Sequence, residues 1–139
     1  MSKAVIVYWS STGNTEAMAK AVEKGLKEGG AEVVLAEAGK ANAGVIDGYD
    51  LLAFGCPAMG DEVLEEDEFE PFFKSVEGKL SGKKVALFGS YDWGEGKWMS
   101  DWQKRTEDAG AKVFEKGFIQ QQEPDEAVCV EFGKRFAGF

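Results

Sequence analysis

The chain has 139 residues, 44% of them hydrophobic and 29% charged, which is the composition of one globular domain with a single core. Its 25 acidic residues outnumber its 16 basic ones, and the formal net charge is −9. This balance argues against nucleic acid and anionic membranes as partners and favours a partner with a basic face. No apolar run is long enough to span a membrane, and Met1-Ser2-Lys3 leads into the first apolar run without a signal peptide.

Histidine is absent, which removes the commonest general base and the commonest zinc ligand. The two cysteines, Cys56 and Cys129, lie far apart and form no CxxC motif. We therefore expect reduced, partly buried thiols, a cytoplasmic protein and no metal site.

Short apolar runs alternate with longer segments of helical period along the chain. Strands are predicted at Ala4–Trp9, Glu32–Ala36, Leu51–Cys56, Lys84–Gly89 and Val113–Ile119, the last interrupted by Lys116-Gly117; helices are predicted at Glu16–Lys27, Phe69–Val76, Trp98–Asp108 and Asp125–Phe136. This alternation predicts an α/β fold, with a parallel sheet covered by helices on both faces. Five strands fit the order 2-1-3-4-5, in which a ligand sits at the carboxyl ends of strands 1 and 3. We expect residues 1–139 to form a single domain.

The loop after the first strand is Ser10-Ser11-Thr12-Gly13-Asn14-Thr15, and a helix is expected to begin at Asn14 or Thr15. It holds four hydroxyl side chains, an amide and a flexible glycine, but no Lys or Arg. Such a loop can direct several N–H groups at one oxyanion, and the helix dipole adds to the attraction. It therefore predicts a phosphate held by neutral donors. An ordinary helix cap is the alternative.

The loops after the third and fourth predicted strands meet the first loop at the same edge of the sheet. They are Cys56-Pro57-Ala58-Met59-Gly60-Asp61-Glu62 and Gly89-Ser90-Tyr91-Asp92-Trp93-Gly94-Glu95-Gly96. Met59 and Trp93 each stand next to a glycine. A phosphate loop flanked by Met, Tyr and Trp suits a planar ring with a phosphate tail, whereas the alternative for these side chains is ordinary packing.

From the first strand to the final helix, the chain resembles the short-chain flavodoxins of anaerobic bacteria. The similarity lies in the three loops just described and in the stretches Lys83–Gly89 and Gly96–Met99. It implies a flavodoxin-like three-layer sandwich that binds FMN noncovalently and carries electrons without being an enzyme. The positions that match the family's FMN contacts are Ser10, Ser11, Thr12, Gly13, Asn14, Thr15, Pro57, Ala58, Met59, Gly60, Asp61, Glu62, Ser90, Tyr91, Asp92, Trp93 and Gly94.

The resemblance also implies roles for single residues. Trp93 covers one face of the flavin ring, Met59 approaches the other, and Glu62 accepts a hydrogen bond from the ring N3–H. The peptide of Gly60 turns over when N5 gains a proton, so that its carbonyl accepts from N5–H and favours the neutral semiquinone. Glycine suits this turn because a positive φ costs other residues about 1 kcal/mol or more.

The electrostatics point to a low-potential carrier. Seven acidic residues form an uncompensated run beside the expected flavin edge: Asp61, Glu62, Glu65, Glu66, Asp67, Glu68 and Glu70. Nearby negative charge raises the energy of the anionic reduced flavin, so the semiquinone–hydroquinone couple is the expected working couple. The same acids steer basic redox partner proteins to a monomeric carrier. Asp92 stands where relatives commonly carry glycine, and it adds repulsion.

Other proteins with this strand order fit less well. A receiver domain needs acidic residues after strand 1, and a tyrosine phosphatase needs a cysteine-led loop closing on arginine; neither is present. The main alternative is an FMN-dependent NAD(P)H:quinone or flavin reductase on the same fold. Trp93 over the ring and the acidic rim would repel an anionic NADPH. A further alternative is a maturation flavoprotein dedicated to one partner, and no feature of the sequence discriminates against it.

Overall fold

The computed structural model describes residues 2–139. The elements, in chain order, are β1 (Lys3–Tyr8), α1 (Asn14–Glu28), β2 (Glu32–Glu37), the 3₁₀ turns η1 (Ala38–Lys40) and η2 (Ala43–Ile46), β3 (Leu51–Gly55), α2 (Phe69–Glu77), β4 (Lys84–Tyr91), α3 (Lys97–Asp108), β5 (Lys112–Val113), β6 (Phe118–Gln121) and α4 (Glu126–Ala137). All four predicted helices are confirmed, with ends that differ by at most two residues. Within these residues, no helix is both long enough and apolar enough to cross a membrane.

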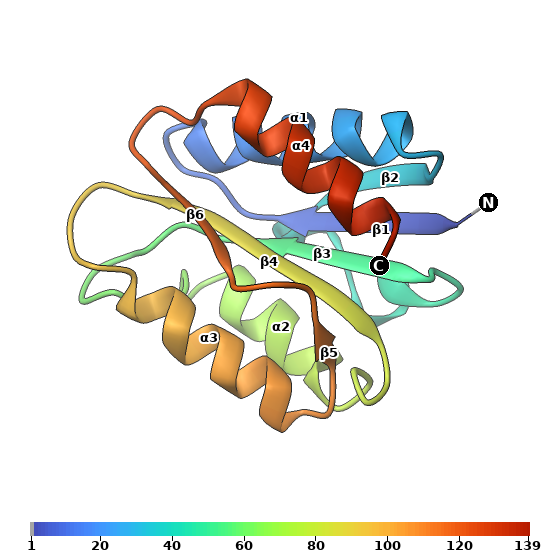
Figure 1. Ribbon diagram of the computed structural model, residues 1–139. Helices are drawn as coiled ribbons and strands as arrows, with labels where there is room; N and C mark the ends of the chain where they lie inside the picture. The colour runs from blue at the N-terminus through green and yellow to red at the C-terminus, as the bar shows by residue number, and fades with distance from the viewer. Residues whose placement is uncertain (1) are drawn as a thin grey trace.

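The strands form one parallel sheet in the order β2-β1-β3-β4-β5, as the sequence predicts (Figure 1). β1 lies between β2 and β3, with Tyr8 beside both Glu37 and Gly55. A sixth strand, β6, also pairs with β4 in parallel. The carboxyl ends of β1, β3 and β4 therefore lie at one edge of the sheet, as the ligand-binding rule for this topology requires.

The predicted fifth strand is divided into β5 and β6, and both pair with β4. The break follows from two residues of the intervening segment. Glu115 has a φ of 51°, and a Cβ on Gly117 would lie 2.4 Å from the Cγ atom of Met99 on α3. Gly117 also donates its N–H to the side chain of Gln103 at 2.9 Å. The chain thus leaves the sheet to pass against α3 and returns to it further along.

Side chains alternate along the central strands between two cores. Val5 and Val7 of β1 pack with Phe69 and Phe73 of α2 and with Trp98 of α3. Ala4, Ile6 and Tyr8 pack on the opposite face with α1 and α4. The helices α2 and α3 thus cover one face and α1 and α4 the other, which makes three layers (Figure 1).

Both cysteines are free and buried. Burial raises the pKa of Cys129 to about 11 and that of Cys56 further. The raised pKa values disfavour the thiolate, which is the reactive form of cysteine. They serve as small core residues, as predicted.

One strand boundary differs in a way that matters for the site. β4 continues to Tyr91, two residues beyond the predicted end at Gly89. Ser90 and Tyr91 pair with Gln120 and Gln121 of β6, and the Ser90 carbonyl accepts from the N–H of Ala58 at 3.1 Å. These two residues therefore belong to a strand and not to the loop. The prediction was wrong here because the partner strand is distant in sequence.

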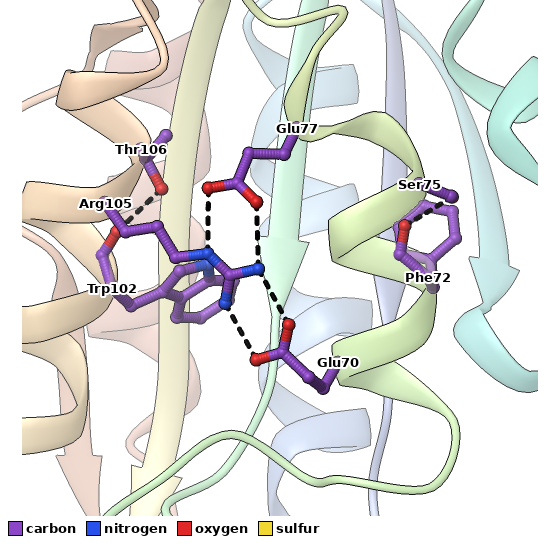
Figure 2. A network of polar contacts seen from close by, with 7 residues as sticks. All are labelled: Glu70, Phe72, Ser75, Glu77, Trp102, Arg105 and Thr106. Carbon is purple, nitrogen blue, oxygen red and sulfur yellow. Dashed lines mark hydrogen bonds and ion pairs between the residues drawn. The ribbon is translucent and has the colours of Figure 1, made fainter.

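An arginine on α3 joins the two helices of one face (Figure 2). The Arg105 guanidinium donates to both carboxylate oxygens of Glu70 at 2.8 and 2.7 Å, and to both of Glu77 at 2.9 and 3.0 Å. It also lies over the Phe73 ring, 4.9 Å from its centroid. The hydrogen bonds to Glu70, followed by those to Glu77, raise the pKa of the guanidinium. Two forked, charge-assisted contacts of this kind specify arginine rather than lysine.

We expect Arg105→Lys to lower the free energy of unfolding by about 1 kcal/mol, because lysine keeps the charge but not the forked bonds. The side chains of Arg105 and Glu70 are 28% and 37% exposed, so solvent screens part of the attraction. Urea unfolding measures the change. The control is Lys104→Ala, which breaks only an exposed 3.4 Å pair with Asp108 and should cost less than about 0.5 kcal/mol. Equal losses of unfolding free energy in the two variants would contradict a stabilising role for the Arg105 hydrogen bonds.

Candidate cofactor site

The loop between β1 and α1 is shaped by one serine. Ser10 Oγ accepts from the backbone N–H groups of Gly13 and Glu16, both at 3.2 Å. Gly13 is the N-cap residue of α1 and has a φ of 98°, a conformation that favours glycine. The Ser10 hydroxyl therefore stabilises the turn into the helix, and its own proton remains available to a ligand.

Backbone donors are concentrated at the start of α1. Ser10 Oγ occupies the N–H of Gly13 and Glu16, and the Gly13 carbonyl accepts from Ala17 at 2.9 Å. Within residues 2–139, no hydrogen-bond acceptor meets the backbone N–H of Ser11, Thr12, Asn14 or Thr15. Ser11 and Thr12 are exposed as well, so their hydroxyls face solvent. Free N–H groups at a helix N-terminus form an anion site, and they fit a phosphate.

A buried pair of hydroxyls links this loop to the end of β4. Thr15 Oγ1 lies 2.7 Å from Ser90 Oγ, and the two residues are 1% and 5% exposed. The Thr15 side chain thus points beneath the loop, and its contribution at the loop surface is the backbone N–H. The pair holds the first and third predicted loops side by side.

The second loop turns sharply at its tip. Met59 and Val63 exchange backbone hydrogen bonds of 2.9 Å, which close the turn over Gly60, Asp61 and Glu62. Gly60 has a φ of 50°, and no atom lies within 4 Å of the position of a Cβ there. The requirement for glycine is therefore conformational and not steric. Pro57 is buried at the base of the loop, while Met59 is half-buried.

The second and third loops enclose a small cavity. It measures about 40 Å³ and is lined by Ala58, Gly60, Glu62, Asp92 and Trp93. Trp93 is 61% exposed, which is unusual for the largest apolar side chain. An indole left open beside a glycine-rich turn suits stacking on a flat ring.

Glu62 ties these two loops to α3. Its Oε1 atom accepts from the backbone N–H of Gly96 at 3.2 Å and of Lys97 at 3.0 Å. A Cβ on Gly94 would lie 2.6 Å from this carboxylate, so a glycine is needed there for the close approach. The second oxygen, Oε2, accepts no hydrogen bond from the described residues and can accept one from a ligand.

The acidic run is compensated in part, which corrects the expectation from the sequence. Glu70 is paired with Arg105, and Glu68 accepts from Trp9 Nε1 at 2.8 Å. Glu62 and Glu65 accept from backbone N–H groups. Among residues 2–139, no hydrogen bond or ion pair engages the side chains of the remaining three, Asp61, Glu66 and Asp67, and all three are exposed. Of the seven, only Glu70 has a cationic partner, and Asp61, Glu66 and Asp67 are the ones whose carboxylates accept no hydrogen bond within these residues.

Two supporting residues were not identified as such from the sequence. Glu65 is only 6% exposed and binds three backbone N–H groups. Gln121 Nε2 donates to the carbonyl of Asp92 at 3.2 Å. A buried glutamate inside an acidic run is not distinguishable by composition from its solvated neighbours. Gln121 is the last residue of β6, and its contact with Asp92 joins residues 29 positions apart, so it leaves no local pattern.

A larger cavity of about 630 Å³ lies away from the three loops, between α1 and the turn before α4. It contains Lys20, Lys24 and Glu126, and Asn14 is its one lining residue from the predicted site. Its wall combines small apolar residues with the ion-pairing side chains of Lys20, Lys24 and Glu126 and contains no aromatic side chain, so we assign the site to the converging loops instead. In the described part of the chain, no three His, Cys, Asp or Glu side chains gather as a metal site.

Comparisons with known proteins agree with this geometry. The sequence model of the family "Flavodoxin" matches residues 6–133. The chain is 54% identical over 134 residues to a flavodoxin of Clostridium beijerinckii, covering 95% of this chain and 97% of that protein. It is 46% identical over 132 residues to a flavodoxin of Megasphaera elsdenii, covering 95% and 96%.

Solved structures lead to the same family. The solution structure of two-electron reduced Megasphaera elsdenii flavodoxin superposes with a TM-score of 0.90 at 47% identity, covering 98% of this chain and 99% of that one. The crystal structure of oxidised flavodoxin 1 from Bacillus cereus gives a TM-score of 0.86 at 28% identity, covering 99% and 98%. The chain therefore belongs to the flavodoxin family, as a short-chain flavodoxin that uses FMN as its cofactor for electron transfer and is not an enzyme.

Proposed function

We propose that residues 1–139 act as one FMN-binding domain that shuttles single electrons between redox enzymes at low potential, mainly between the semiquinone and hydroquinone states. The observation that carries this proposal is that the N-terminus of α1, with its unbonded N–H groups, lies at the same edge of the sheet as the exposed indole of Trp93. The Thr15–Ser90 bond and the cavity beside Trp93 support that convergence. The buried, free thiols suit work in the cytoplasm.

In this proposal, the phosphate is held without a counter-charge. The unbonded N–H groups of Ser11, Thr12, Asn14 and Thr15 are directed by the start of α1, and the exposed hydroxyls of Ser11 and Thr12 add donors. Ser10 and Gly13 keep the turn in the conformation that presents these donors. Pre-formed donors reduce the ordering that binding would otherwise require.

The ring end is formed by the other two loops. Bound FMN supplies the redox chemistry, and the protein supplies orientation, hydrogen bonds and charge. Trp93 covers one face and Met59 approaches the other, while Oε2 of Glu62 accepts from the ring N3–H. The Gly60 carbonyl lies on a turn that can reverse at little cost at this residue, because glycine adopts φ values of either sign. Pro57, Ala58, Asp61, Ser90, Tyr91, Asp92 and Gly94 complete the enclosure.

The free acids set the potential and the partner. Asp61, Glu66 and Asp67 have exposed carboxylates on the loop that borders the ring end, and Asp92 adds another on the facing loop. Negative charge there disfavours further negative charge on the cofactor, which lowers the potential of the second electron. The net charge of −9 attracts the basic faces of redox partner proteins, and the protein works as a monomer.

Anaerobic titration with reductant tests the proposal. The visible spectrum should pass through a long-lived one-electron-reduced species that absorbs at long wavelength before it bleaches. Direct bleaching to the two-electron state would exclude a one-electron carrier. Absence of flavin binding after addition of FMN would instead exclude the assigned site.

Removal of one exposed hydroxyl, Thr12→Val, should weaken FMN binding by roughly tenfold, since a hydrogen bond to a charged group contributes about 1.5 kcal/mol. Riboflavin lacks the phosphate and serves as the control ligand, so its affinity should stay the same. Quenching of flavin fluorescence by the apoprotein measures both affinities. A parallel loss for riboflavin would show that the loop acts on the ring and not on the phosphate.

Gly60→Ala should reduce the separation between the two one-electron potentials by about 40 mV, the equivalent of 1 kcal/mol of added strain in the turned peptide. Spectroelectrochemistry measures both potentials. The matched control is Gly82→Ala, since Gly82 also has a positive φ, 76°, and open space at its Cβ, but lies before β4 at the opposite edge of the sheet. If Gly60→Ala left the separation unchanged, the role assigned to this turn would be wrong.

Asp92→Asn should raise the potential of the second reduction by about 10–30 mV, because an exposed charge nearby contributes roughly 0.2–0.7 kcal/mol. The effect should shrink in 1 M salt. Asp108→Asn removes the same charge at the far end of α3 and should leave this potential unaltered. A fall in potential for the Asp92 variant would contradict the electrostatic account.

A further inference from the structure

Glu65 uses its carboxylate as a cap for a helix that begins four residues later. Oε2 accepts from the N–H of Asp67, and Oε1 accepts from the N–H groups of Glu68 and Phe69, each at 2.8 Å. The side chain of Glu68, the formal N-cap residue of α2, makes no capping bond. Glu65 therefore satisfies three donors at the start of α2 that its neighbours leave open.

The backbone of Glu65 is hydrogen-bonded to residues at both ends of the segment between β3 and α2. Its N–H donates to the Sγ atom of buried Cys56 at 3.4 Å, and its carbonyl accepts from the N–H of Glu70 at 2.8 Å. The carbonyl of Cys56 in turn accepts from the buried Trp98 Nε1 at 3.1 Å. Glu65 thus connects the end of β3 to the start of α2 and closes the base of the loop between them.

The anchored base leaves only the tip of the loop, residues 60–62, without backbone hydrogen bonds among the described residues. Ala58 is bonded to Ser90, and Met59 is bonded to Val63. A cavity of about 290 Å³ lies beside the tip and is lined by Met59, Gly60, Val63, Glu65, Glu66 and Asp67. The hydrogen bonds on both sides of the tip therefore limit how far it can move.

We propose that Glu65 is a positioning residue for the ring end of the site: its carboxylate fixes where the descending side of the loop returns to α2, and thereby holds Met59 and Glu62 in place. The inference rests on the proposed function, because it assigns the ring to this loop. It does not require Glu65 to touch the cofactor. A loop whose base is anchored loses less freedom when a ligand binds to its tip.

The test compares Glu65→Gln with Glu66→Gln in the full chain. Both variants remove one negative charge at adjacent positions, but Glu66 is exposed and accepts no hydrogen bond from the described residues. Glutamine at 65 keeps one acceptor oxygen and turns an amide donor toward at least one of the three N–H groups. We expect Glu65→Gln to weaken FMN and riboflavin binding equally, by about tenfold, and Glu66→Gln to weaken each by less than twofold.

Amide hydrogen exchange supplies a readout that does not depend on flavin. The N–H groups of Met59, Val63 and residues 67–69 should exchange faster in Glu65→Gln than in Glu66→Gln, while those of α4 should be unaltered. Equal flavin affinities of the two variants would overturn the inference, as would a loss confined to FMN, which would point to the phosphate loop. Failure of the unaltered protein to bind riboflavin or FMN would instead overturn the proposed function.

Discussion

The arrangement of the site depends on how β1 connects to its two neighbours. β1 pairs with β2 on one side and β3 on the other, so the chain must leave the sheet in opposite directions after β1 and after β3. α1 packs on one face and α2 on the other, which separates the two loops at the carboxyl edge. A crevice at this switch point is a consequence of the strand order. In the proposed site, the loop after β1 lies on one side of this crevice, and the loops that carry Met59 and Trp93 lie on the other.

The acidic residues of the Met59 loop serve two purposes. Glu62 and Glu65 place their carboxylates on the backbone N–H groups at the starts of α3 and α2, where the helix dipoles favour negative charge. Glu70 is engaged by Arg105. The same run thus supplies both the caps of two helices and three exposed carboxylates, those of Asp61, Glu66 and Asp67. In a protein without histidine, carboxylates and backbone groups carry most of this polar organisation.

Most of the elements could be predicted because their signals are local. The apolar runs at β1, β3 and β4 and the period of the four helices are visible in short windows of sequence. The interruption of the last strand at Lys116-Gly117 was also visible, and the structure adds its reason, which is that Gly117 must pass Met99. The error of detail involves a distant partner. Ser90 and Tyr91 are in a strand because β6 pairs with them, and this pairing leaves no pattern in the residues around them.

The sequence by itself determined the order of the sheet, the residues of the three loops and the resemblance to flavodoxins, because each rests on apolar period or on short motifs. Only the tertiary structure decided how the charges are used. It separated Glu65 and Glu70, which are engaged by amide groups and by Arg105, from Asp61, Glu66 and Asp67, which face solvent. The reason is that a carboxylate's role depends on what lies within hydrogen-bonding distance, and those partners come from other elements of the fold.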